Sequence, residues 1–341
     1  MHLYFVGLDV HKQVIAFCVK TSSGEIVSEG NIRATRAALD EWVKTLPGPW
    51  HGGMEATMFS HWIYHHLKPH AQCLEMGHAA SMKAISAGKK KSDKIDARTI
   101  ADLLRCDLFP SCYVIAPELG ALRQQMRFRR LVVEDTVMFQ NKTAGLLMSA
   151  GVEYERRRLH GKRYFRDLVQ DNQWIGEELR PLLTFNREQT ETLQAMEQRL
   201  TRMLERHPRL QARVNALQAI DGVGPVTALT WALEIATPER FRSLKAAMSY
   251  CGLTSALRES AGQQKRGPLS KQRNRHLQSA LIEAGKIAPL VNEKLREVHR
   301  KAKDKGGHAN RATLAVARKL VAFLLAADRA FLARQREPSP A

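Results

Sequence analysis

Residues 3–9 read LYFVGLD, a short apolar run that ends in a carboxylate, and VHK follows at 10–12. A run of this length and composition predicts a buried β-strand. Residues 13–20 (QVIAFCVK) form a second run with β-branched and aromatic side chains. The turn-forming stretch TSSGE leads from it to a third strand near 26–31. Because the connections are short, we expect the three strands to pair as antiparallel neighbours.

Helices and strands alternate after this point. Residues 34–46 have helical spacing of Ala38, Trp42 and Leu46, and Pro47-Gly48-Pro49 ends the pattern. Further elements are predicted as a strand near 50–54, a helix ending near Leu67, a strand at 71–75 and a helix at 79–87. This order is typical of an α/β domain whose later strands run parallel.

The remaining chain reads as mostly helical. A basic loop, GKKKS at 88–92, precedes a helix that starts at Asp93, and residues 117–210 contain long charged helices. Residues 188–208 have apolar positions near heptad spacing, which is compatible with a coiled-coil arm or with an ordinary exposed helix pair. A final helix is expected from about Ala309 to Arg334. We therefore predict three domains, at 1–115, 116–210 and 211–341.

The charge balance indicates a polyanionic partner. The 341 residues carry a formal net charge of +19, and 19 Lys and Arg against 7 Asp and Glu lie between Arg258 and Ala341. That concentration favours a C-terminal nucleic-acid surface over a general solubility effect. Five scattered cysteines and the lack of an apolar run of about 18 residues predict a cytoplasmic protein without a membrane span.

Four carboxylates suggest a metal site. Asp9 ends the first strand, Glu55 follows a later strand after two glycines, and Asp93 and Asp96 lie three apart at a helix start, on one face. Oxygen ligands of this kind suit Mg²⁺, and two such ions can promote phosphodiester chemistry. Each acid also has a simpler explanation, since Asp93 and Asp96 could cap the helix and complement its dipole. Only the combined order favours a metal.

The C-terminal part offers candidate phosphate contacts. Residues 219–228 (AIDGVGPVTA) resemble the hairpin of a helix-hairpin-helix module, in which Gly222 and Gly224 would free backbone N–H groups to approach a phosphate. A turn packed inside the protein is the alternative. Serine hydroxyls follow among many cations, and a phosphate-binding role is open to this stretch. The candidates are Ser255, Ser260, Ser270, Arg258, Lys265, Arg266 and Lys271, together with Lys89, Lys90 and Lys91 beside the acids.

Several motifs together resemble one family. GLDVHK, MEAT, KKSDKIDARTIADLL, AIDGVGPVTA and LSKQRNRHL are similar to motifs of the DEDD transposases of the Piv/MooV type, the insertion-sequence one-ten family, over nearly the whole chain. The chain departs at Met58 and Ser60, where the family usually has Gly and Tyr. The resemblance implies an N-terminal RuvC-like (RNase H-like) domain. It also places Asp9, Glu55, Asp93 and Asp96 on the family's metal-site acids, with Mg²⁺ or Mn²⁺ as the cofactor.

The resemblance further implies a site-specific recombinase that excises and inserts its element. In that family a serine of the second domain becomes covalently linked to DNA, and the alignment falls on Ser260, with Ser270 as the alternative. Double-stranded DNA, a structured guide RNA and at least a homodimer are the implied partners, with the protein on the nucleoid when it acts. Two other functions stay open: a metal-dependent nuclease or junction resolvase that hydrolyses with water, and a non-catalytic nucleic-acid-binding protein.

Overall fold

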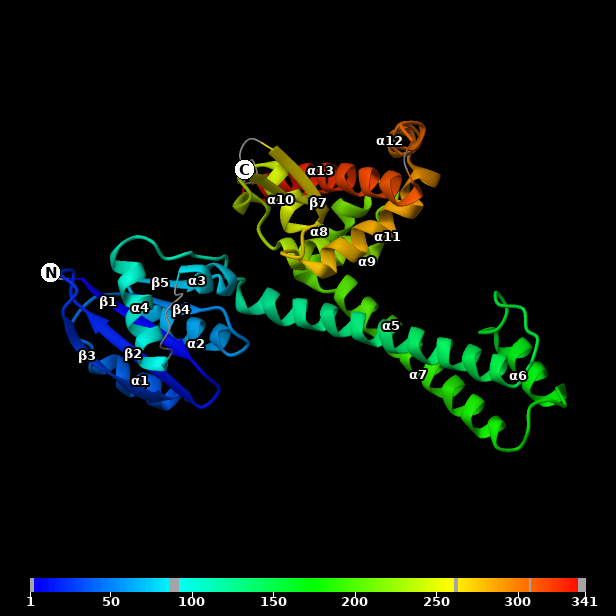
Figure 1. The fold of residues 1–341 in the computed structure, drawn as a ribbon, viewed down its shortest axis with the longest axis horizontal. Coiled ribbons are helices and arrows are strands. Elements are labelled where there is room, and N and C mark those ends of the chain that lie inside the picture. The colour runs from blue at the N-terminus through cyan, green and yellow to red at the C-terminus, as the bar shows by residue number, and fades with distance from the viewer. Residues whose placement is uncertain (1–2, 86–91, 261–262, 307, 337–341) are drawn as a thin grey trace, which may run out of the picture. The chain divides into compact units, whose positions relative to one another are not determined.

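The computed structural model describes residues 3–85, 92–260, 263–306 and 308–336. The chain divides into two compact units, Met1–Pro117 and Glu118–Ala341. A mixed α/β region is followed by a mostly helical part, as the sequence predicts (Figure 1). The division into three domains stays a prediction.

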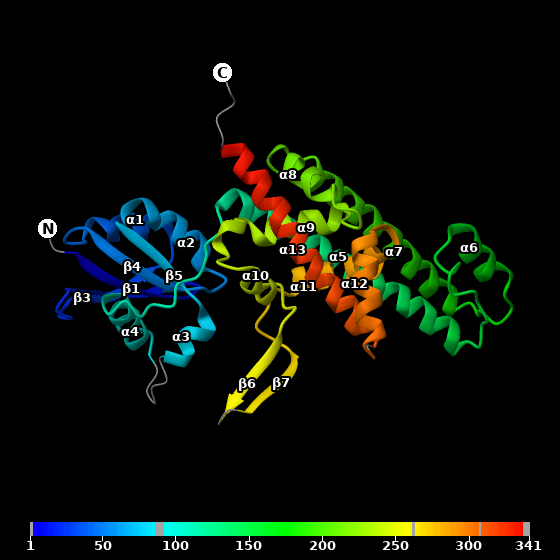
Figure 2. The ribbon, with the colours of Figure 1, turned by 90° about the horizontal axis from the view of Figure 1, so that it is seen from above.

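The first unit contains a single five-stranded sheet among its described residues, and the sheet has the order β3-β2-β1-β4-β5. Strands β1, β2 and β3 pair antiparallel, whereas β4 runs parallel to β1 and β5 runs parallel to β4. Helices α1 and α2 lie on one side of the sheet and α3 and α4 on the other (Figure 2). The elements are β1 (Tyr4–Val10), β2 (Val14–Lys20), β3 (Ile26–Arg33), α1 (Arg36–Lys44), β4 (Trp50–Glu55), α2 (Ser60–Leu67), η1 (Lys68–His70), β5 (Cys73–Gly77), α3 (Ala79–Ile85) and α4 (Asp93–Arg105).

Side chains of β1 alternate between the two faces of the sheet, as the strand period of two requires. Val6, Leu8 and Val10 are buried in a cluster that includes Trp42 of α1 and Ile63 of α2. On the other face, the ring of Phe5 packs against the cluster of Met82, Ile100, Leu103 and Leu104. The apolar residues of the sequence therefore form a core on each side of the sheet.

Helix α4 lies unusually close to β1 at Gly7. A Cβ atom built at Gly7 would be 2.0 Å from the carbonyl oxygen of Ala97 and 2.6 Å from the backbone nitrogen of Ala101. Both of these neighbours are backbone atoms of α4, so no side-chain rotation relieves the clash. The small residues Gly7, Ala97 and Ala101 thus allow the helix to sit directly on the strand.

Ion pairs fix α4 along the sheet. Arg98 donates two hydrogen bonds to the Glu29 carboxylate of β3, at 2.7 and 2.8 Å, and Lys94 lies 2.6 Å from the same group. The Nζ of Lys20, which is nearly buried, donates to Asp102 at 2.5 Å. Hydrogen bonds from Arg98 and then from Lys94 lower the pKa of Glu29 to about 2. Helix α4 is therefore anchored to β3 through its N-terminal half and to β2 through its C-terminal half.

The second unit is built from helices and one hairpin, and in Figure 2 the hairpin projects from the helices of this unit. The sequence predicts a mostly helical part here, which the structure confirms, and the hairpin is an addition that the sequence did not predict. The elements are α5 (Pro117–Ser149), α6 (Lys162–Asp171), α7 (Leu179–Glu205), α8 (Pro208–Gln218), α9 (Pro225–Ile235), η2 (Pro238–Arg240), α10 (Leu244–Tyr250), β6 (Ser255–Ser260), β7 (Gln263–Leu269), α11 (Arg275–Val291), α12 (Glu293–Asp304) and α13 (Ala309–Arg336).

The main core of this unit contains a buried polar network. Arg213 of α8 donates two hydrogen bonds of 2.7 Å to Asp328 of α13, and Trp231 of α9 donates a third at 2.9 Å. Asp328 is fully buried and Arg213 nearly so. A buried charge is tolerated only when it is paired and hydrogen-bonded. These contacts join three helices that are distant in sequence.

Helices α5 and α7 run antiparallel to each other. Arg129 of α5 donates to Thr201 of α7 at 2.8 Å, and farther along α5 the ring of Phe139 contacts Phe185, which lies earlier on α7. At the far end of the pair is a separate small core of seven buried residues: Leu147, Val152, Leu159, Phe165, Val169, Ile175 and Leu183. The predicted coiled coil itself stays a prediction.

None of the helices that the structure describes is long and apolar enough to span a bilayer. All five cysteines carry free thiols.

Replacing Gly7 by alanine is expected to destabilise the first unit. The added methyl group meets backbone atoms of α4, and overpacking of this kind costs about 1–3 kcal/mol or more. Calorimetry of the full chain should show the unfolding of this unit at a lower temperature in Gly7→Ala. Gly145→Ala is the control, because Gly145 is in a helix with nothing within 4 Å of its added Cβ and should gain slight stability. An unchanged transition in Gly7→Ala would contradict the close packing.

Replacing Glu29 by glutamine should reduce stability in a pH-dependent way. The folded-state pKa of Glu29 is about 2, below its ordinary value of 4.5, so its pairing with Arg98 and Lys94 stabilises the fold above about pH 4.5. That contribution is lost as the pH falls toward 2. We expect Glu29→Gln to lower the Tm at pH 6, and the difference from wild type to shrink between pH 4.5 and pH 2. A difference that stays constant over this range would contradict the pairing.

Candidate functional site

Three side chains converge where β1 ends and α4 begins. Ligand atoms of Asp9, His11 and Asp93 all lie within 4.8 Å of one another. The Nε2 of His11 is 3.0 Å from one oxygen of Asp9 and 3.5 Å from an oxygen of Asp93. Asp9 is mostly buried, with 13% of its side chain exposed, whereas His11 and Asp93 are exposed at 54% and 66%. The cluster is thus open to solvent on one side.

The local fold explains this convergence. Asp9 is two residues after Gly7 on β1, so both positions lie on the face that α4 covers. Ser92 is the N-cap of α4, and its side chain accepts a hydrogen bond from the Ile95 N–H. Asp93 and Asp96 therefore do not have the N-cap role. They lie in the first turn of the helix, above the end of β1.

The carboxylates repel one another electrostatically. Burial raises the pKa of Asp9 above its ordinary value, and the negative charges of Asp93 and Asp96 raise it further, whereas the contact with His11 acts in the opposite direction. A cation in contact with these oxygens would relieve the repulsion. The oxygen donors are of the kind that hard divalent cations prefer.

Glu55 approaches from the neighbouring strand. It is the last residue of β4, and Leu8 pairs with Met54 in the parallel register, so Glu55 lies beside the position of Asp9. Neither Glu55 nor Asp96 belongs to the group of three ligand atoms described above. The loop after Glu55 is held by Ser60, whose hydroxyl donates to the Glu55 carbonyl and accepts from the Thr57 N–H. Ser60 supplies local contacts at a position where the chain departs from the family pattern.

His11 is a member of this cluster that was not predicted from the sequence. The signal was present in Asp-Val-His, since residues two apart along a strand direction point the same way. The Nε2 of His11 contacts both Asp9 and Asp93, so the imidazole links the end of the strand to the helix. Lys89, Lys90 and Lys91, which were predicted to guide a nucleic acid beside this site, lie outside the described residues.

In the second unit, the glycine turn between α8 and α9 is packed on one side and open on the other. Gly222 has φ +93°, and a Cβ there would be 2.5 Å from the Cβ of Ala288 of α11. Gly224 precedes α9 and has nothing within 4 Å of a built Cβ. Gly222 is therefore required for packing against α11, whereas the predicted phosphate contact of this turn stays a prediction.

The same turn borders a groove of about 740 Å³. Three arginines line it, yet Arg127 pairs with the buried Glu234 at 2.7 Å and Arg130 with Glu134 at 2.8 Å. Arg129 pairs with Glu197. Carboxylates thus neutralise the cations of this groove, and its lining is not a basic patch.

The hairpin β6–β7 contains most of the predicted serine and cation positions. Ser260 is the last residue of β6, and the register pairs Ser260 with Gln263, Arg258 with Lys265 and Leu257 with Arg266. The side chains of 257–266 lie outside the described residues, so only their strand positions are known. Ser255 begins β6 and is exposed.

Ser270, the other serine candidate, takes part in local hydrogen bonds. Its hydroxyl accepts a hydrogen bond from the Gln272 N–H at 3.2 Å, and its backbone N–H donates to the Thr254 carbonyl. It therefore stabilises the turn between β7 and α11. Lys271, which follows it, is exposed to solvent.

Comparison with known proteins identifies both halves of the chain. Residues 6–151 match the model of the DEDD transposases of the IS110 type, which is described as "Transposase". Residues 214–300 match the model described as "Transposase IS116/IS110/IS902 family". A "Probable family 20 transposase" of Pseudomonas aeruginosa is 27% identical over 293 residues, which cover 83% of each chain. The "Putative transposase y4qE" of Sinorhizobium fredii is 26% identical over 82% of this chain and 70% of its own.

A third relative, the "Transposase for insertion sequence element IS1533" of Leptospira borgpetersenii, is 24% identical and covers 68% of this chain and 69% of its own. The two family models together match more than half of the residues, in the order in which the units occur. The chain belongs to the IS110 family of transposases, enzymes that act on DNA.

Proposed function

We propose that this transposase excises and inserts its own insertion sequence, and that strand cleavage depends on a divalent cation held by Asp9, Glu55, Asp93 and Asp96. The observation that carries the proposal is the convergence of Asp9, His11 and Asp93 at the start of α4, with Asp96 close enough to act on Asp9. The strand order, with three antiparallel strands followed by two parallel ones, supports a RuvC-like (RNase H-like) domain.

The donor set fits a hard cation. The four acids supply only oxygen, and burial makes the negative charge of Asp9 unfavourable without a counter-ion. Mg²⁺ or Mn²⁺ is the cation that we propose, and when bound it would stabilise the charge that develops on phosphodiester oxygens. His11 would orient the Asp9 carboxylate through the 3.0 Å contact, as outer-shell partners of metal ligands do.

For the second unit, we propose Ser260 as the nucleophile. Its hydroxyl oxygen would form a bond to phosphorus while the bond from phosphorus to a deoxyribose oxygen breaks. The serine proton would be released to solvent, and the leaving oxygen would take one up. Rejoining would reverse these bonds. Arg258 and Lys265 occupy paired strand positions two residues from the pair of Ser260 and Gln263. Arg266 and Lys271 follow later in the chain, and this concentration of cations supports phosphate binding by the hairpin.

The net charge and the helix pair α5–α7 suggest which partners the protein binds. The net charge of +19 supports double-stranded DNA and a structured guide RNA as joint ligands. The open backbone at Gly224 supports a phosphate contact of the helix-hairpin-helix kind, with Gly222 holding the turn in place. The antiparallel pair α5–α7 would serve as a coiled-coil contact in a homodimer or a larger assembly. The protein would act in the bacterial cytoplasm, on the nucleoid.

Loss of the acids should abolish excision. A plasmid carrying the gene with its native flanking DNA is amplified across the element's ends, and the circular junction is quantified. We expect Asp96→Asn and Asp9→Asn to reduce this junction by about 100-fold or more, since a lost metal contact costs several kcal/mol of transition-state stabilisation. Glu25→Gln, an exposed acid of the same unit, is the control and should match wild type. Retained excision in both aspartate variants would overturn the metal site.

Loss of the serine should give the same result for a different reason. We expect Ser260→Ala to yield no junction, whereas Ser255→Ala on the same strand should retain it, and Ser270→Ala should lose only the turn contact. A covalent protein–DNA adduct should form with wild type and not with Ser260→Ala. Metal-dependent cleavage that persists in Ser260→Ala would favour hydrolysis by water instead, and loss only in Ser270→Ala would move the nucleophile there.

A further inference from the structure

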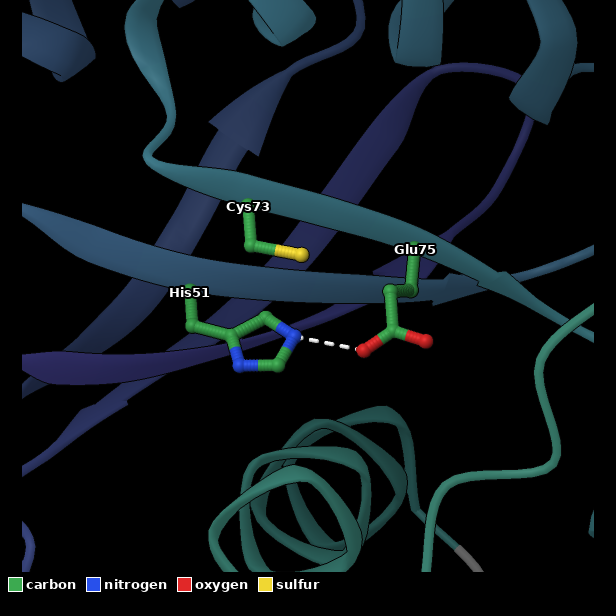
Figure 3. Close-up of side chains that lie close together, drawn as sticks. All are labelled: His51, Cys73 and Glu75. Atoms are coloured by element: carbon green, nitrogen blue, oxygen red, sulfur yellow. Dashed lines mark hydrogen bonds and ion pairs between the residues drawn. The ribbon is translucent and has the colours of Figure 1, made fainter. Parts of the chain in front are cut away.

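A second cluster of side chains that could bind a metal lies near the beginning of strands β4 and β5 in the first unit. His51 of β4 is paired with Cys73 of β5, and Glu75 follows two residues later on β5. The three side chains therefore share one face of these strands. Ligand atoms of all three lie within 4.8 Å of one another, and Figure 3 shows them converging from the two strands.

The three donors form a mixed set. They offer an imidazole nitrogen, a thiol sulfur and a carboxylate oxygen, a combination that suits zinc and its neighbours rather than magnesium. The Nε2 of His51 is 2.6 Å from an oxygen of Glu75, and the two side chains are 21% and 28% exposed. With the thiol deprotonated, two negative ligands and a neutral imidazole would balance a divalent ion in this partly covered place.

The three ligand atoms would need to move only slightly to bind a tetrahedral ion. At ordinary zinc–ligand lengths, tetrahedral ligand atoms are about 3.3–3.6 Å apart. The present hydrogen bond between His51 and Glu75 is shorter than this, and the other separations stay within 4.8 Å. An ion would replace the hydrogen bond between His51 and Glu75, and the ligand atoms would shift by about 1 Å.

A neighbouring hydroxyl orients the carboxylate. Ser111 donates to the second oxygen of Glu75, and the chain at Ser111 is held by a bridge to Gly77 at the end of β5. The first oxygen of Glu75 is thereby left directed at His51 (Figure 3). The ring of Phe5 lies 5.9 Å from the imidazole and covers it on the β1 side. Outer contacts of this kind are typical of protein metal sites.

This cluster is distinct from the acidic site. His51 is four residues before Glu55 on the same strand, a separation of about 13 Å at the ordinary rise of a strand. No residue is common to the two groups. The two sites also differ in donor chemistry, because the acidic site has no sulfur.

We propose that His51, Cys73 and Glu75 bind a transition-metal ion of the zinc class, which clamps β4 to the edge strand β5. Three protein ligands leave one tetrahedral position open, and a water molecule would be the fourth ligand. Binding releases the Cys73 thiol proton to solvent, and neutral His51 binds through Nε2 with its single ring proton on Nδ1. The clamp restrains the strand that ends in Glu55 without entering the DNA chemistry.

Cobalt titration of the purified full-length chain, first stripped with a chelator, tests the proposal. Four-coordinate Co²⁺ bound to a thiolate gives an intense charge-transfer absorption in the near ultraviolet. We expect one equivalent of Co²⁺ to produce that band and one equivalent of Zn²⁺ to remove it. Cys73→Ser should abolish the band, and Glu75→Gln should weaken Zn²⁺ binding at least about tenfold. Zn²⁺ should raise the Tm of wild type and leave that of Cys73→Ser unchanged.

Two controls separate this site from its surroundings. Cys106→Ser removes an exposed cysteine of the same unit and should keep the band. Asp9→Asn alters the acidic site and should also keep it, so failure of the transposition proposal would leave this result intact. Absence of the band in wild type, its retention in folded Cys73→Ser, or its loss in Cys106→Ser would overturn the proposal. A far-ultraviolet circular dichroism spectrum like that of wild type establishes that Cys73→Ser is folded.

Discussion

The direct contact between α4 and β1 at Gly7 is the constraint on which the first unit depends. No side chain separates the helix from the strand there, so the first turn of α4 is brought down to the level of Asp9. A larger residue at Gly7 would lift the helix and separate Asp93 and Asp96 from the strand end. The ion pairs of Glu29 with Arg98 and Lys94 then fix the helix along the sheet. The acidic site is thus a product of backbone packing as much as of its carboxylates.

In the second unit, a buried carboxylate holds the helices together. Glu234 is almost fully buried in α9, where Arg127 of α5 donates two hydrogen bonds and Asn274 donates a third to its carboxylate. Burial alone would raise the pKa of Glu234, yet these contacts together leave it below the ordinary value. The base of α5 is therefore attached to the helical core by a carboxylate that stays ionised. Positive charges used in this way are not available to bind nucleic acid, which explains why the net charge of +19 does not make every arginine-lined groove basic.

Much of the first unit could be predicted from the sequence because its signals are local. The short apolar runs, the turn at Gly24 and the helix start at Asp93 depend on neighbours in the chain. The hairpin β6–β7 was missed because its strands are polar and lack the apolar alternation that reveals a half-buried strand. The cluster of His51, Cys73 and Glu75 was missed because it depends on the pairing of two strands more than 20 residues apart.

The separate core at the end of the α5–α7 pair has a consequence for how this protein tolerates change. Leu147, Phe165, Ile175 and Leu183 are buried among themselves and belong to a different cluster from the main core of the unit. Segments with their own small core open as local cooperative units while the remainder stays folded. The far end of the helix pair is therefore a module within the unit. Insertions or deletions in its loops should disturb this small core and leave the helices that contain Asp328 and Glu234 folded.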